Sequence, residues 1–233
     1  MRTLILIFFI LFSNLSSQVD KSSKIIEKVK ENFDLIQDYS AQVKIKVDFP
    51  DAVIPEINAR IYYKKPDKIK VDSDNFLIIP KQSIKFAPDA IFQKNFTSFL
   101  TDETELDKVK HFTIRIIPED QSGGEFITIF VNSKNYTIKK ISVLSARTGK
   151  VDIEFFYKLI ENRFWLPERI EAFLETKGIR FSRLRKMQKE NQEQSENKSE
   201  NKIGKLTIEY FNFAVNKGLD DSIFNESSER KEK

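Results

Sequence analysis

Apolar and polar side chains alternate along most of this chain with the period of two that is typical of β-strands having one buried face. The alternation is clearest over Ser40–Phe49, where one side is apolar: Ala41, Val43, Ile45, Val47 and Phe49. It predicts further strands at Glu56–Lys65, Lys68–Ser73, Phe76–Ile79, Ser83–Phe86, Val109–Ile117, Glu125–Val131, Tyr136–Leu144, Lys150–Lys158, Glu168–Thr176, Ile179–Arg185 and Ile203–Phe213. The links between most of these segments are short. This favours antiparallel pairing, because parallel connections need a dozen or more residues.

Two segments have helical rather than strand-like spacing. Lys21–Gln37 predicts an amphipathic helix whose apolar face carries Ile25, Ile26, Val29, Phe33 and Ile36. Pro88–Leu100 breaks the alternation and predicts a second, short helix with a bulky apolar stripe formed by Ile91, Phe92, Phe96, Phe99 and Leu100.

Together these elements predict an α+β fold with about eleven antiparallel strands. So long a sheet curls, and its edges must be covered or closed. We therefore expect a strongly curved, unclosed β half-barrel with helices covering its concave face. The predicted domain is 19–221, interrupted by a disordered hairpin loop at 186–202 that is polar and apolar-poor, and followed by a flexible tail at 222–233.

Residues 1–18 have the three-part pattern of a secretory signal peptide. Arg2 is followed by the apolar run Leu4–Phe12 and by a small, polar segment that ends at Gln18. The run is too short to span a bilayer, which takes about 20 residues. The alternative is a buried N-terminal strand or helix. The chain has no cysteine, so it offers no disulfide and no lipid-attachable thiol at the signal boundary.

The charge composition excludes one class of function. The net charge of +4 arises from 39 basic and 35 acidic residues that are interspersed, which is typical of a mixed solvated surface and not of a nucleic-acid-binding protein. The 21 phenylalanines fit either a large apolar cavity or the codon usage of an AT-rich genome, and the count does not separate the two.

Catalytic chemistry has few candidates in this chain. His111 is the single histidine, and a structural role is its simplest interpretation. Asp152 and Glu154 could form a catalytic carboxylate pair, but their spacing places them on one strand face opposite Val151, Ile153 and Phe155, where a solvated outer surface explains them more simply. We therefore expect a binding protein without enzymatic activity, cofactor or metal.

One motif points to a family. Glu56–Ser73 reads EINARIYYKKPDKIKVDS, a strand, a basic pair before Pro66, and a second strand, all following an N-terminal helix. This arrangement resembles the periplasmic lipoprotein carriers of the LolA/LolB-like family, as a divergent member. The resemblance implies an unclosed half-barrel whose helices act as a lid over a hydrophobic groove.

The same resemblance implies a chaperone-like function in outer-membrane biogenesis. A soluble, non-lipidated, monomeric periplasmic carrier would bind the acyl chains of lipoproteins or related lipids. It would receive them from an inner-membrane ABC-type lipoprotein-releasing complex and deliver them to an outer-membrane acceptor. The alternative from another class is a non-catalytic protein-binding or sensor module of the cell envelope on the same fold. A continuous apolar cavity favours the carrier, and a filled core with a flat exposed interface favours the sensor.

Candidate groove residues follow from the strand and helix patterns: Val43, Ile45, Val47, Ile57, Ile61, Tyr63, Phe92, Phe96 and Phe99. Ordinary core packing is the alternative for each of them. Lys65 continues the apolar phase of its strand, so we expect it to point toward the interior. Family carriers place an arginine before the motif proline, where it bonds to lid-helix carbonyls. The resemblance therefore implies that Lys65 is a lid latch, although lysine lacks the planar fork of arginine. The alternative is a snorkelling lysine beside Tyr63.

Overall fold

The alternating segments form strands of one sheet. The computed structural model describes residues 19, 21–49, 52–73, 92, 95–119, 125–145, 149–175 and 203–225. Its elements are the long helix at residues 21–34, a short helix α4 (Ser222–Asn225), and the strands β1 (Asp38–Phe49), β2 (Ala52–Val53), β3 (Ile57–Lys64), β4 (Lys68–Ser73), β5 (Phe96–Leu106), β6 (Val109–Pro118), β7 (Glu125–Asn132), β8 (Ile138–Ser145), β9 (Gly149–Ile160), β10 (Phe164–Glu175) and β11 (Ile203–Val215).

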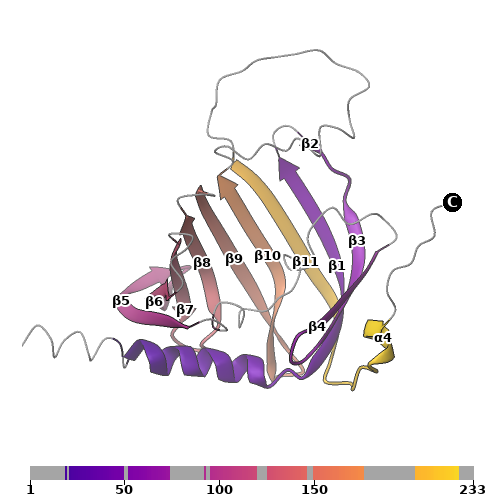
Figure 1. Ribbon diagram of the computed structural model, residues 1–233, viewed down its shortest axis with the longest axis horizontal. Coiled ribbons are helices and arrows are strands. Elements are labelled where there is room, and N and C mark those ends of the chain that lie inside the picture. Colours follow the sequence, from indigo (N-terminus) through magenta and orange to yellow (C-terminus); the bar gives the residue numbers. More distant parts are fainter. Residues whose placement is uncertain are drawn as a thin grey trace, which may run out of the picture.

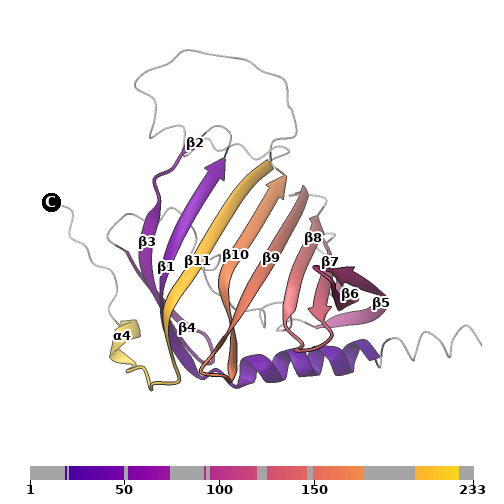
Figure 2. The same ribbon diagram turned by 180° about the vertical axis from the view of Figure 1, so that it is seen from behind.

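The sheet has eleven strands in the order β4-β3-β1-β11-β10-β9-β8-β7-β6-β5, with β2 paired to β1 outside this path (Figure 1). Every pairing is antiparallel. Among the described strands, β4 and β5 are the two edges, so the sheet is open (Figure 2). This confirms the predicted α+β half-barrel, and β4 has the predicted bounds.

The sequence pattern was wrong at two places. Residues 96–100 belong to strand β5 and not to a helix, and the two-residue strand β2 was not predicted. At the carboxyl end, α4 extends the described structure four residues beyond Asp221. The predicted strands at 76–79, 83–86 and 179–185, the predicted loop at 186–202 and the predicted signal peptide at 1–18 lie outside the described residues.

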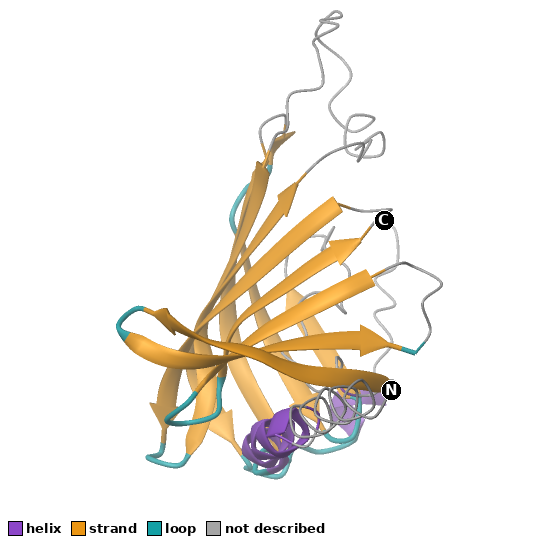
Figure 3. Ribbon diagram, turned by 90° about the vertical axis from the view of Figure 1, so that its left-hand side faces the viewer, coloured by secondary structure: helices purple, strands orange, loops and turns teal. Residues whose placement is uncertain are grey.

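The sheet curves around a concave face on which the long helix lies (Figure 3). Residues directly opposite each other in an antiparallel pair share a face. The strand registers therefore define a continuous apolar row across eight strands of the concave face: Val47, Leu206, Ala172, Ile153, Ile141, Ile129, Ile114 and Leu100.

A bulge in β11 changes which side chains face inward. The register between β1 and β11 shifts opposite Ser40–Gln42, and Asn212 has a φ of 55°. Asparagine tolerates this left-handed conformation better than most residues. The extra residue turns Phe213 toward the concave face, where its ring lies 6.0 Å from those of Tyr39 and Tyr210.

The long helix joins two strands that are far apart in the sheet. At its start, Ser22 Oγ lies 2.9 Å from Ser98 Oγ on β5. Along its length, Asn32 donates to the carbonyl of Asn135 in the turn between β7 and β8 at 2.8 Å. At its end, Asp34 forms an ion pair with Lys65, directly after β3.

Buried polar groups fix the segment that follows β11. The Asp38 carboxylate is buried and accepts hydrogen bonds from the backbone N–H groups of Lys217 (3.0 Å) and Gly218 (3.1 Å). Lys64 and Lys68, opposite each other on β3 and β4, both form ion pairs with Asp221. These contacts hold α4 beside β4.

Candidate functional site

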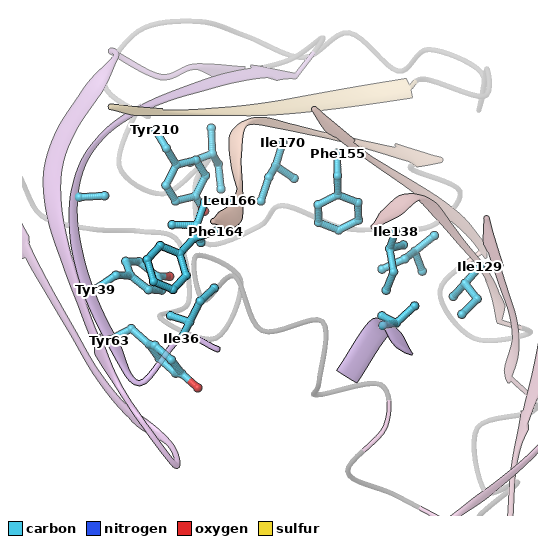
Figure 4. Close-up of a cluster of buried hydrophobic side chains, with 14 of the residues drawn as sticks. Ile36, Tyr39, Tyr63, Ile129, Ile138, Phe155, Phe164, Leu166, Ile170 and Tyr210 are labelled. Atoms are coloured by element: carbon cyan, nitrogen blue, oxygen red, sulfur yellow. The ribbon is translucent and has the colours of Figure 1, made fainter. Parts of the chain in front are cut away.

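The concave face is buried where the long helix covers it. Tyr39, Leu166 and Ile36, from two strands and from the segment after the helix, are buried and lie together there, and Phe155 is buried farther along the same face (Figure 4). The row Ile57, Ile45, Ile208, Ile170 and Phe155 crosses five strands, and no more than 8% of any of these side chains is exposed. This end therefore forms the packed core of the protein.

The concave face is less covered toward the opposite ends of the same strands. There the apolar side chains are only partly buried although they face inward. We call this set the apolar band; it consists of Val47 on β1, Leu206 on β11, Ala172 and Leu174 on β10, Val151 and Ile153 on β9, Val143 on β8 and Ile127 on β7.

The band is long and narrow. Neighbouring strands lie about 4.8 Å apart, so six strands span roughly 24 Å, whereas two inward residues on one strand span about 7 Å. The strand registers place four of its residues side by side in one row: Leu174, Val151, Val143 and Ile127. The neighbouring row of the band contains Ala172 and Ile153. The band thus has the length and width of a hydrocarbon chain that lies across the strands.

The convex face is charged over the same strands. Asp152 accepts a hydrogen bond from Ser142 at 2.6 Å and forms ion pairs with Lys140 and Lys150. Desolvation acts to raise the pKa of Asp152, but the hydrogen bonds from Ser142 and Lys150 and the charge of Lys140 outweigh it, so the pKa lies below its ordinary value. Glu154 also lies near Lys140, at 3.9 Å. The two carboxylates therefore belong to an outer ionic network.

His111 is part of the packed structure. Only 3% of it is exposed, and its Nδ1 lies 2.8 Å from the carbonyl oxygen of Val109, to which it donates. Over the part of the chain that the structure describes, no group of three or more His, Asp or Glu side chains could hold a metal ion.

Most of the predicted groove residues lie on the concave face, but at its packed end. Val43, Ile45, Ile57, Ile61 and Tyr63 are core residues, each less than 10% exposed. Val47 alone among the β1 and β3 candidates belongs to the apolar band.

The three phenylalanines expected on a lid helix have different positions. Phe92 is buried, and the Phe96 ring lies 5.9 Å from it. Phe96 and Phe99 are on strand β5, which corrects the helical prediction. Because Ser98 is the inward residue that bonds to Ser22, Phe99 points to the opposite face of the sheet. A strand, unlike a helix, separates residues three apart onto opposite faces.

Sequence reasoning did not select most of the apolar band as a site. Seven of its eight members, all except Val47, lie on strands β7–β11. Their alternation was visible in the sequence, for example Val151 and Ile153 between Lys150, Asp152 and Glu154. What identified them is their partial exposure, which depends on where the long helix lies.

Lys65 contacts the end of the long helix and the segment that follows it. Its Nζ lies 2.8 Å from Asp34 Oδ1, and its backbone N–H donates to the Gln37 carbonyl at 2.8 Å. The side chain is 26% exposed, and that of Asp34 is 74% exposed. Lys65 therefore lies at the rim, and its ammonium contacts a helix carboxylate.

These features define an open β half-barrel with an apolar concave face that one helix covers in part. Solved structures share this shape. A DUF1329 family protein from Desulfovibrio piger matches with a TM-score of 0.62 at 11% identity, over 89% of this chain and 97% of that one. A domain described as an outer membrane lipoprotein-sorting protein, from Vibrio parahaemolyticus, matches with a TM-score of 0.58 at 9% identity, over 85% and 95%.

A LolA superfamily protein from Nitrosomonas europaea matches with a TM-score of 0.51 at 15% identity, over 88% of this chain and 97% of that one. The chain therefore has a LolA-like fold, as the motif around Pro66 predicted. No protein-family model and no curated protein matches the sequence. Among the described residues, no helix has the length and apolar content needed to cross a membrane.

Proposed function

We propose that this protein is a carrier that binds the acyl chains of lipoproteins, or of related lipids, against the apolar band. The observation that carries the proposal is the partial exposure of eight inward-facing apolar side chains on a sheet whose convex face is charged. Further burial of these partly exposed side chains against a hydrocarbon guest would be favourable, because it removes apolar surface from water. The LolA-like fold supports the same function.

The energetics of such a carrier require partners. Burying a methylene group is worth about 0.8 kcal/mol, so a chain of about 15 methylenes gains roughly 12 kcal/mol relative to water. A lipid that starts in a bilayer already has this burial, so transfer from bilayer to protein gains little by itself. We propose that an inner-membrane ABC-type complex supplies the energy for loading, and that an outer-membrane acceptor receives the cargo.

This function also sets the cellular location. We propose that residues 1–18 direct export, that the carrier domain begins at 19, and that the protein works in the periplasm without a lipid anchor of its own. Within it, the packed core under the long helix forms the closed end of the binding surface. Lys65 holds the end of that helix through Asp34, which is the latch that its position suggests.

The test is whether lipid binding depends on the apolar band. Native mass spectrometry of the protein purified from a bacterial host should show co-purifying acyl species. The Ile153→Asp variant should weaken binding of a fluorescent fatty acid by at least about tenfold, because a carboxylate facing hydrocarbon is poorly solvated. Ile153 is partly exposed, so the variant should still fold, which circular dichroism checks.

The matched control is Phe211→Asp. Phe211 is an exposed apolar residue on the convex face, opposite Gln42, and its replacement should leave fatty-acid affinity unchanged. A ligand-free wild-type protein that binds no acyl probe would refute the carrier. Selective capture of a purified envelope protein by that ligand-free chain would support the sensor module instead.

A further inference from the structure

Exposed apolar side chains gather at the ends of strands β7–β11 that lie away from the long helix. The helix contacts the turn between β7 and β8 through Asn32 and Asn135, so Phe126 and Leu144 lie at the opposite ends of these strands. They are directly paired with each other. We call this end of β7–β11 the far rim.

Large apolar side chains are exposed on the convex side of the far rim. Phe126 is 54% exposed, Leu144 is 55% exposed, and Ile203 at the start of β11 is 59% exposed. Lys150 lies opposite Leu144 in the same outer row. One residue along the chain from Phe126 and Leu144, the inward-facing Ile127 and Val143 belong to the apolar band.

One residue in from the ends of β7 and β8, the far rim is thus apolar on both faces, with Phe126 and Leu144 outward and Ile127 and Val143 inward. The property is local, because the end residues Glu125 and Ser145 and the outward Lys150 are polar. The next outer row toward the helix is mostly polar and consists of Thr128, Ser142, Asp152, Phe173 and Lys205. In that row Asp152 is held by Ser142 and Lys140, and the Lys205 ammonium lies 5.3 Å from the Phe173 ring. The usual arrangement of one apolar and one polar face therefore breaks down at Phe126 and Leu144, one residue from the ends of β7 and β8.

We propose that the far rim is a membrane-contacting edge that enters the interfacial region of a lipid bilayer. A flat protein partner could cover one face of a sheet edge, but the headgroup and upper acyl region of a bilayer surrounds an edge from both sides. Phe126 and Leu144 would lie among the upper acyl segments, and the long side chain of Lys150 would reach phosphate groups.

This inference rests on the proposed carrier function and adds a route for the cargo. The outer row of the far rim and the apolar band belong to the same strand ends, so an acyl chain could move from the bilayer to Ile127 and Val143 without crossing water. The rim would then control the rate of lipid transfer, and the band would control lipid affinity in solution.

The experiment measures binding of the full chain to vesicles of phosphatidylethanolamine and phosphatidylglycerol by flotation. The double variant Phe126→Ser/Leu144→Ser should bind about tenfold less tightly or worse, because two exposed apolar side chains no longer leave water. The control Phe211→Ser removes an apolar residue that is 39% exposed on the convex face away from the far rim, and it should bind vesicles like the wild type.

A spectroscopic variant reports where the rim lies. The chain has one tryptophan, so Phe126→Trp in a Trp165→Phe background places a single probe at the far rim. Its emission should shift to shorter wavelength on addition of vesicles and should be quenched by brominated acyl chains. Unshifted emission, or equal vesicle binding by the double variant and the wild type, would overturn the proposal.

Two further readouts separate the possible failures. Fatty-acid affinity without vesicles should be the same for the double variant and the wild type. A wild type with no fatty-acid affinity would refute the carrier. Vesicle binding, in contrast, reports on the far rim alone. Sedimentation equilibrium tests for a second copy of the chain. Self-association abolished by Phe126→Ser/Leu144→Ser, with no vesicle binding by the wild type, would assign the far rim to a dimer interface and refute membrane contact.

Discussion

At the scale of single residues, strand β9 separates two environments within three positions. Val151 and Ile153 face the apolar band, and Asp152 between them faces the convex side. The carboxylate of Asp152 is held by Ser142, Lys140 and Lys150. This network keeps the charge on the outer side of the sheet and fixes the orientation of the strand that presents Ile153.

Asp152 also makes stability depend on pH. Its folded-state pKa lies below the ordinary value of 3.8 because the hydrogen bonds and positive charges around it outweigh desolvation. The stabilisation is therefore complete above the unfolded-state pKa and is lost as the pH falls through the folded-state pKa. The free energy of unfolding of wild type should exceed that of Asp152→Asn at neutral pH, and the difference should shrink well below pH 3.8.

Urea titrations at several pH values measure this difference. Asp48→Asn is the matched control, because Asp48 is an exposed aspartate with which no ion pair is described. A difference between wild type and Asp152→Asn that stays constant from neutral to acidic pH would show that the ionic network around Asp152 does not act through the charge of its carboxylate.

At the scale of elements, the bulge in β11 decides which aromatic side chains enter the core. In a regular strand without this bulge, Phe213 would point to the convex face, because strict alternation after Ile208 and Tyr210 would turn Asn212 inward and Phe213 outward. Inside, Phe213 contacts Tyr39 and Tyr210. The bulge thus lets one strand contribute both Ile208 and Phe213 to the same face.

Substitutions at Asn212 test this role. Its φ of 55° suits asparagine or glycine but is strained for a β-branched residue. Asn212→Gly should change the free energy of unfolding little, whereas Asn212→Val should destabilise the protein by about 1–2 kcal/mol. Denaturant titration compares the two variants. Equal stability of Asn212→Val and Asn212→Gly would mean that the bulge does not need the left-handed conformation.

The end of the long helix is a second element-scale feature with a measurable consequence. The Lys65–Asp34 pair is largely exposed at Asp34, and exposed ion pairs contribute about 0–1 kcal/mol. Lys65→Leu should therefore hardly change global stability. It should speed amide exchange in the last helical turn and, if the pair acts as a latch, increase the amount of cargo-bound protein.

Hydrogen exchange with mass spectrometry and acyl-probe titration measure both effects. Lys68→Leu is the control, because Lys68 forms its ion pair with Asp221 and not with the long helix. Unchanged exchange at residues 30–34 and unchanged loading in Lys65→Leu would remove Lys65 from the binding mechanism.

At the scale of the whole molecule, the sequence pattern located strands wherever one face is buried and the other is solvated. It misassigned β5 for three physical reasons. Phe96, Phe99 and Leu100 also fit helical spacing, and a register shift between Leu100 and Asp102 interrupts the alternation. In addition, the inward residue Ser98 is polar because it bonds to Ser22, 76 positions earlier. A local pattern cannot show such a long-range partner.

The site was only partly predictable for a similar reason. Val47 and its neighbours on β1 and β3 lie on the concave face, yet whether each lies in the core or in the apolar band depends on which part of that face the long helix covers. The helix position is set by its contacts with Ser98, Asn135 and Lys65. These contacts are tertiary and leave no periodic signal.

The long helix has one more consequence. It is attached to β5 at Ser98 and to the end of β3 at Lys65, two strands that lie at or next to opposite edges of the described sheet. Fourteen helical residues have a fixed length of about 21 Å, so they set the chord of the arc that the strands follow. Inserting or deleting one helical turn would widen or tighten that arc. Under the proposed carrier function, it would thereby change the size of guest that the half-barrel accepts without altering any side chain on the sheet.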